Sequence, residues 1–160
     1  RYISVTGVQT CALPISAAIL YEVSGRLAQQ GGAALFIDYG HDQPRTGSSL
    51  QAVREHRKVD VFATPGEADL TAHVDFSALA LIAQAKGVRW QGTVGQGRWL
   101  RALGIEARAD ALAAFSPAHA DAIHAARERL TGEGQMGVLF KVMGLSAENW
   151  PAGAGFGPAG

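Results

Sequence analysis

The sequence of 160 residues is poor in cysteine and in charge, and each shortage excludes a class of protein. Cys11 is the only cysteine, which excludes a disulfide framework and a multi-cysteine metal site and favours a reducing compartment, here the bacterial cytoplasm. Charged residues make up 18% of the chain, below the usual value of about 25%. The net charge is zero, which disfavours nucleic acid and anionic membranes as partners. No run of about 18 apolar residues is present, so we expect no membrane span.

Both ends of the chain lack the pattern of a packed element. Residues 1–16 show no sustained hydrophobic period, contain Pro14 and resemble translated sequencing-adaptor read-through, so we expect an artefact there and a truncated product. Residues 146–160 are rich in Gly, Ala and Pro, which predicts a flexible tail. The string GAGFG at 153–157 imitates a nucleotide-binding loop, but no helix pattern follows it in this sequence, and we reject that match.

Hydrophobic periodicity predicts helices that alternate with short strands. The run at 33–37 is apolar without alternation, which predicts a strand buried on both faces, as in a parallel sheet, and ending at Asp38. Residues 41–61 are polar and basic and predict an excursion from the sheet. The strand at 138–143 contains Lys141, which favours a position near the sheet edge. The expected elements are helices at 17–30, 76–86, 99–103, 106–115 and 117–130 and strands at 33–37, 88–94 and 138–143. Their order indicates an open α/β sheet with crossover helices.

The strongest candidate site follows the strand at 33–37. Asp38, Tyr39, Gly40 and His41 would lie at the carboxyl end of this strand, where α/β sheets bind ligands. Asp38 can accept hydrogen bonds from a cationic substrate, Gly40 permits close backbone approach, and His41 can accept a proton near neutral pH. The alternative is ordinary turn chemistry, in which Asp38 caps nearby amides, Tyr39 packs and His41 is solvated.

A second cluster lies in the string GEADLTAHVDF at 66–76. Asp69, Thr71, His73 and Asp75 alternate with apolar residues, so an extended segment would place them on one face. We expect no metal site, because an extended segment rarely wraps its ligands around one ion and no metal-binding helix spacing is present. We expect Asp75 to cap the next helix, and the other three side chains to hold the excursion against the sheet or to line the cleft of Asp38.

Two other kinds of site have less support. A Ser-His-Asp hydrolase would need a nucleophile elbow, and the sequence contains no G-x-S-x-G string. Trp90, Trp99 and Trp150 are too dispersed to form a stacking platform for single-stranded nucleic acid, so we interpret them as core residues.

Four strings occur in an order that resembles a known family. They are GGAALFIDYGH at 31–41, SLQAVREHRKVD at 49–60, PGEADLTAHVDF at 65–76 and MGVLFKVM at 136–143. They are similar to the C-terminal half of MidA-type class I S-adenosylmethionine-dependent methyltransferases, whose mitochondrial members are complex I assembly factors that methylate a protein arginine. The resemblance implies that residues 17–145 form the C-terminal part of a Rossmann-like sheet with crossover helices and a helical insertion.

The resemblance also implies roles for the two clusters. Residues 33–38, 88–94 and 138–143 would be the fifth, sixth and last strands of the methyltransferase sheet, whereas the family's glycine loop for S-adenosylmethionine has no counterpart. The substrate would be a protein arginine. We expect Asp38 and Asp69 to contact its guanidinium, assisted by the neighbouring Tyr39, Gly40 and Thr71, and His41 or His73 to accept a proton. The alternative is a non-catalytic assembly or interaction module.

Overall fold

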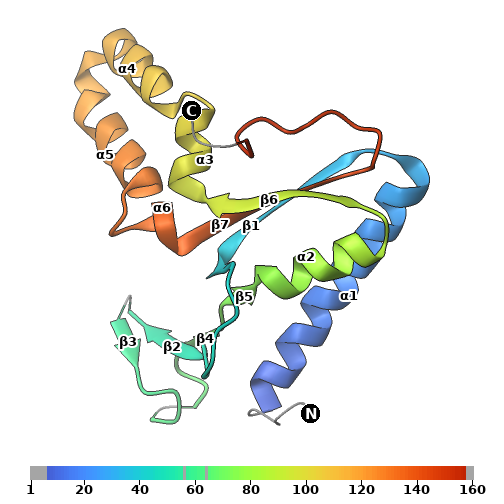
Figure 1. Cartoon of the computed structure of the whole chain (residues 1–160). Coiled ribbons are helices and arrows are strands. Elements are labelled where there is room, and N and C mark those ends of the chain that lie inside the picture. Colours follow the sequence, from blue (N-terminus) through green and yellow to red (C-terminus); the bar gives the residue numbers. More distant parts are fainter. Residues whose placement is uncertain (1–6, 56, 64, 158–160) are drawn as a thin grey trace.

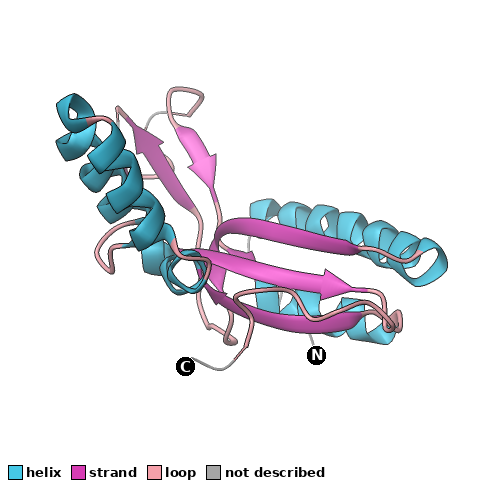
Figure 2. Ribbon diagram, turned by 90° about the horizontal axis from the view of Figure 1, so that it is seen from above, coloured by secondary structure: helices cyan, strands magenta, loops and turns pink. Residues whose placement is uncertain are grey.

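The structure, a computed structural model, describes residues 7–55, 57–63 and 65–157 and contains two sheets. The strands of the larger sheet are β1 (Ala33–His41), β5 (Val74–Asp75), β6 (Arg89–Gly95) and β7 (Phe140–Ser146). They lie in the order β5-β1-β7-β6, and all neighbours except β1 and β5 are antiparallel (Figures 1 and 2). The expected mixture of sheet and helices is confirmed, but the part of the sheet described here is mainly antiparallel.

Two helices pack against one face of the larger sheet. Helix α1 (Gly7–Gln30) begins within the segment that its pattern led us to set aside, and it ends at the predicted position, before a glycine with φ +78°. Helix α2 (Phe76–Ala85) follows β5. The core between these helices and the sheet contains Leu20, Phe76, Met143 and Leu145, each at most 1% exposed. No helix among the described residues is both long and apolar enough to cross a membrane.

The prediction that β1 is buried on both faces was wrong. Alternate residues of β1 are exposed, and Leu35 and Ile37 keep 51% and 48% of their surface in contact with solvent. Ala34 and Phe36 point the other way and pack on the core. The apolar run therefore reflects one face that packs on helices and one that is open, which a run without alternation does not distinguish from full burial.

The prediction that the last strand lies near an edge was also wrong. β7 pairs with β1 on one side and β6 on the other, and Val142 and Met143 are fully buried. The strand begins at Phe140, because the preceding residues form the short helix α6 (Met136–Leu139). Lys141 is accommodated within the central strand because its Nζ reaches out to the carbonyl oxygen of Val138, 3.1 Å away.

The predicted helical insertion connects β6 to β7. It consists of α3 (Gln96–Ala102), α4 (Ile105–Phe115), a short 3₁₀ turn (Pro117–His119), α5 (Ala120–Thr131) and α6. The carboxyl end of α5 is fixed by side chains of α3, since Gln96 donates to the carbonyl oxygen of Leu130 and Arg101 to that of Thr131, both at 2.9 Å. These bonds satisfy carbonyl groups that a helix end leaves free.

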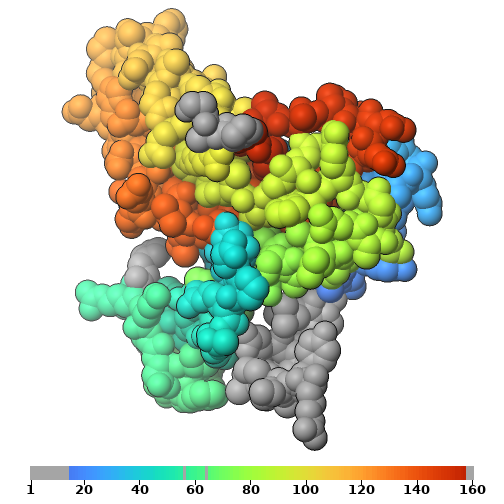
Figure 3. All heavy atoms as spheres, viewed as in Figure 1, coloured from blue at the N-terminus to red at the C-terminus, as the bar shows by residue number. Residues whose placement is uncertain are grey.

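The expected excursion from the sheet is confirmed, and it forms a sheet of its own. β2 (Gln51–Arg54) pairs with β3 (Arg57–Val59) and β4 (Asp69–Thr71) between the end of β1 and the start of β5. This small sheet forms a separate lobe beside the larger sheet (Figure 3).

Residues 147–157 contact both β6 and α3. Gln91 accepts a hydrogen bond from the amide of Gly153, and Trp99 donates to the carbonyl oxygen of Ala154. Composition predicts a flexible tail here, whereas the structure gives the segment defined contacts. The interpretation of the tryptophans as core residues was wrong for Trp90 and Trp150, which are 40% and 46% exposed.

Candidate functional site

The candidate site lies at the carboxyl end of β1, where the small sheet joins the larger one. β1 and β5 run parallel there, with Gly40 opposite Val74 and His41 opposite Asp75. A Cβ at Gly40 would lie 2.9 Å from Cε2 of Phe76 and would collide with the carbonyl oxygen of Val74. Gly40 thus lets β5 and α2 approach β1, whereas the sequence predicted a role in close approach to a ligand.

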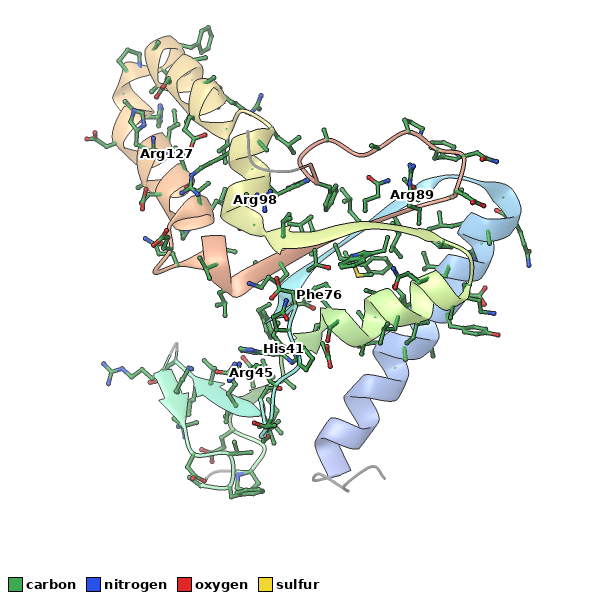
Figure 4. All side chains as sticks on the ribbon, viewed as in Figure 1. His41, Arg45, Phe76, Arg89, Arg98 and Arg127 are labelled. Atoms are coloured by element: carbon green, nitrogen blue, oxygen red, sulfur yellow. The ribbon has the colours of Figure 1, made fainter. Side chains whose placement is uncertain are left out.

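The imidazole of His41 is held by its Nδ1 atom. Nδ1 lies 2.7 Å from the carbonyl oxygen of Gln43 and 3.8 Å from Oδ1 of Asp75. A carbonyl oxygen only accepts hydrogen bonds, so Nδ1 carries the hydrogen and Nε2 of the neutral ring carries the free lone pair. Figure 4 shows His41 at the junction of β1 with the small sheet.

Asp75 links this imidazole to a helix. Its Oδ1 accepts hydrogen bonds from the amides of Ser77 and Ala78, both at 3.1 Å, and from the hydroxyl of Ser77 at 2.5 Å. The predicted cap on α2 is therefore confirmed. The same carboxylate faces Nδ1 of His41, so one residue both starts the helix and places a negative charge beside the imidazole.

His73 is fixed by the small sheet. Its amide donates to Oγ of Ser49, and Nε2 lies 3.1 Å from the side-chain nitrogen of Gln51. The ring meets Tyr39 edge to face, with centroids 6.0 Å apart. Burial lowers the pKa of His73 below its ordinary value of 6.5, and the positive charges of Arg45, His41 and Lys58 lower it further.

Tyr39 lies where the two sheets meet. Its ring packs edge to face against Phe140 of β7, with centroids 5.7 Å apart, and also meets the ring of His73. Tyr39 and His41 share the face of β1 that lies away from Phe36, because side chains alternate along a strand.

The structure does not bring the predicted carboxylates to the histidines. Asp38 lies on the opposite face of β1 from Tyr39 and His41, and its Oδ1 accepts from the amide of Tyr39 at 2.8 Å. Asp69 is exposed in β4 and lines a shallow hollow of the small sheet together with Arg54. Neither carboxylate faces the imidazole of His41.

Of the predicted site residues, Tyr39, His41 and His73 come together. Thr71 lies at the end of β4, two residues before His73, and is half-buried. Sequence reasoning missed Asp75 as the partner of His41. The only signal was the position of Asp75 before a helix, which predicts a cap and says nothing of the strand that pairs beside it.

The glycines at the start of α3 do not form a cradle for S-adenosylmethionine. The glycines that begin α3 are packed against protein, since a Cβ at Gly95 would lie 3.1 Å from the carbonyl oxygen of Gly137 and one at Gly97 3.1 Å from its Cα. A phosphate- or nucleotide-binding glycine loop instead leaves its backbone open to the ligand. Among residues 7–55, 57–63 and 65–157, no group of three or more His, Cys, Asp or Glu side chains is placed to hold a metal ion.

Comparisons with known proteins agree on one family. Residues 6–94 match the family described as putative S-adenosyl-L-methionine-dependent methyltransferase. The mitochondrial protein arginine methyltransferase NDUFAF7 of Rattus norvegicus is 45% identical over 63% of this chain and 22% of its own length. Its homologue in Drosophila melanogaster is 38% identical over 75% of this chain and 28% of its own length. The chain thus spans about a quarter of the length of these relatives.

Two solved structures from Burkholderia thailandensis share the fold. The first, of an uncharacterized protein, is 32% identical, has a TM-score of 0.75 and aligns over 88% of this chain and 38% of its own. The second, of a likely methyl transferase bound to S-adenosyl-homocysteine, is 32% identical, has a TM-score of 0.74 and aligns over 87% and 37%. These neighbours confirm the Rossmann-like fold expected from the sequence.

Proposed function

Because this chain belongs to the family of putative S-adenosyl-L-methionine-dependent methyltransferases, we propose that the intact enzyme transfers a methyl group from S-adenosylmethionine to a protein arginine. The family match covers more than half of the chain, and the relatives with 45% and 38% identity are named protein arginine methyltransferases. The resemblance to complex I assembly factors favours a subunit of that complex as the substrate.

We assign this chain to the acceptor side of the reaction. Gly95 and Gly97, the glycines that begin α3, are packed against protein, so we assign the residues that hold S-adenosylmethionine to the three quarters of its relatives that this chain does not span. What it contributes is the convergence of Tyr39, His41 and His73 at the carboxyl end of β1. This end of a strand is where ligands of open α/β sheets bind. That convergence carries the proposal.

The three side chains suit a nitrogen nucleophile. Methyl transfer needs the acceptor nitrogen held in line with the sulfonium methyl group and a group that takes the proton released. Tyr39 offers a ring and a hydroxyl for positioning, and His41 offers an unprotonated Nε2 in its neutral form. Asp38 and Asp69 lie away from this face, so we place their contacts with the substrate protein outside the reacting centre.

Calorimetry tests whether S-adenosylmethionine binds to residues outside this chain. We expect the intact enzyme, spanning the length of its relatives, to bind S-adenosylmethionine and the present chain alone to bind it negligibly. Mass spectrometry of candidate substrate proteins incubated with the intact enzyme should then show a 14-Da increment per transferred methyl group, about the mass of one CH₂, located on arginine. Tight binding by the present chain would contradict the assignment of the cofactor to the rest of the enzyme. An intact enzyme that binds no S-adenosylmethionine would instead favour a non-catalytic assembly module.

The single cysteine favours a reducing environment, and we place the protein in the bacterial cytoplasm, whereas the animal relatives are named mitochondrial.

A further inference from the structure

We propose that Asp75 is a positioning residue whose carboxylate faces the imidazole of His41, which the carbonyl oxygen of Gln43 holds with Nε2 free, so that His41 takes the proton of the acceptor nitrogen. This inference rests on the proposed function. It adds a residue, a particular nitrogen atom and a direction of proton transfer.

The geometry fixes which ring nitrogen is free. Nδ1 of His41 donates to the carbonyl oxygen of Gln43 at 2.7 Å, so Nε2 is the basic atom of the neutral ring. Among the described residues the structure shows a hydrogen bond at Nδ1 of His41 and none at Nε2. A base whose lone pair is not used by the protein is ready to accept a proton from a ligand.

The carboxylate of Asp75 is placed to stabilise the charge that follows. Its Oδ1 lies 3.8 Å from Nδ1 of His41, too far for a hydrogen bond and close enough for a charge interaction. The side chains of His41 and Asp75 are 17% and 28% exposed, so solvent screens the pair less than it screens a surface pair. Protonation of Nε2 would therefore create a cation beside a fixed negative charge.

Asp75 is itself held in place. Two backbone amides and the hydroxyl of Ser77 donate to Oδ1, and they anchor the carboxylate to the first turn of α2. The pairing of His41 with Asp75 in the parallel strands β1 and β5 sets the separation of the two side chains. The pair is thus built from two strands and a helix rather than from a mobile loop.

His73 is arranged differently and is excluded as the acceptor. Its Nε2 accepts from the amide nitrogen of Gln51, and its Nδ1 is buried without a partner among the described residues. Arg45 and Lys58 add positive charge around the ring. Both nitrogens are therefore closed to a substrate, and a proton placed on this ring would be disfavoured.

The proposed step balances as a substitution at carbon. A bond forms between the methyl carbon and the acceptor nitrogen while the carbon–sulfur bond of the sulfonium co-substrate breaks, and its electron pair stays on sulfur. The proton of the acceptor nitrogen passes to Nε2 of His41, and solvent later removes it. During that interval Asp75 faces the imidazolium.

Substitutions in the intact enzyme test the inference. Asp75→Asn keeps a good helix cap and removes the charge, so we expect kcat to fall about 10-fold or more while KM and the affinity for S-adenosylmethionine stay within about twofold. His41→Ala should lower kcat by about 100-fold, and added imidazole should restore part of it. Asp60→Asn is the matched control, because Asp60 also accepts a backbone amide hydrogen, from Phe62, and lies in an exposed turn.

A measurement that does not depend on turnover completes the test. Long-range ¹H–¹⁵N spectra should show the neutral ring of His41 protonated at Nδ1. An Asp75→Asn enzyme with unchanged kcat, an absence of rescue by imidazole, or a ring protonated at Nε2 would each overturn the inference while the wild-type enzyme still methylates arginine. If the wild-type enzyme methylates no arginine, the proposed function fails, and the spectra still decide the geometry.

Discussion

At the residue scale, the two histidines of the site share a location and differ in what surrounds each ring. His41 has one nitrogen bound to a carbonyl oxygen and a carboxylate nearby. His73 has one nitrogen bound to Gln51, the other buried, and cationic neighbours. Burial and the positive charges around His73 oppose an added proton on that ring.

This difference predicts a pH-dependent stability. The pKa of His73 is below 6.5 in the folded protein, so below that pH the unfolded chain binds a proton at this side chain more readily than the folded one. The free energy of unfolding should therefore fall as the pH drops from 6.5 through the lowered pKa. We expect His73→Gln to reduce the loss in Tm of the intact enzyme between about pH 7.5 and about pH 5.5.

Thermal unfolding of His119→Gln serves as the comparison. His119 is exposed in the 3₁₀ turn, and its Nδ1 lies 3.0 Å from the hydroxyl of Ser116. This variant should retain the wild-type dependence on pH. If His73→Gln also retained it, the buried and cationic environment assigned to His73 would be refuted.

The same residues show how far sequence reasoning reached at the site. The end of an apolar strand predicted Tyr39 and His41, and the alternation after residue 66 predicted His73. Asp38 was given to the same site because it is adjacent in sequence, although adjacent residues of a strand face opposite sides. Asp75 was missed because its closeness to His41 depends on strand pairing, which local patterns do not encode.

At the scale of elements, the segment after β7 packs on the sheet at Gly144. The ring of Phe156 lies over Gly144 of β7, where a Cβ would be 2.6 Å from Cζ, and it also packs against Trp99 of α3. A glycine in a strand often marks such a close approach. Phe156 therefore fastens the segment to the centre of the sheet.

A double-mutant cycle tests this contact in the intact enzyme. Phe156→Ala should cost about 1–3 kcal/mol, less than a fully buried phenylalanine, and Gly144→Ala about 1–3 kcal/mol because the added methyl group displaces the ring. The double variant should cost less than the sum of the two, since the methyl group then occupies space that the ring has left. Urea unfolding measures all three values.

Gly157→Ala is the control for the added methyl group. Apart from its chain neighbours, no atom of the described residues lies within 4 Å of a Cβ built at Gly157, so we expect a change of less than about 0.5 kcal/mol. Additive costs for Gly144→Ala and Phe156→Ala would show that the ring of Phe156 does not pack over Gly144 in solution.

Elements differed in how well their pattern identified them. α2 was predicted closely, because Asp75 caps it and Gly87, with φ +72°, follows it. β7 was given the wrong place in the sheet, because Lys141 lowers its apolar character and its pattern does not name its neighbours. The three short strands of the small sheet were described only as an excursion, since three or four residues are too few to show a period.

At the scale of the whole molecule, the larger sheet is open along one side of β1. Residues 33–39 pair with β7 on one edge, while β5 covers the other edge only at Gly40 and His41 among the described strands. Leu35 and Ile37 lie half-exposed along this part of the strand. An unpaired strand edge beside apolar side chains favours association with other chains.

We therefore expect the present chain, expressed alone, to self-associate and to bind a hydrophobic dye such as anilinonaphthalene sulfonate. Leu35→Thr combined with Ile37→Thr should lower both self-association and dye binding, because threonine keeps the strand preference and removes most of the apolar surface. Light scattering and fluorescence give the two readings. Leu81→Gln is the control, since Leu81 is 68% exposed on α2, away from the open edge. A monodisperse wild-type chain with one cooperative thermal transition, or an equal effect of Leu81→Gln, would contradict the role given to this edge.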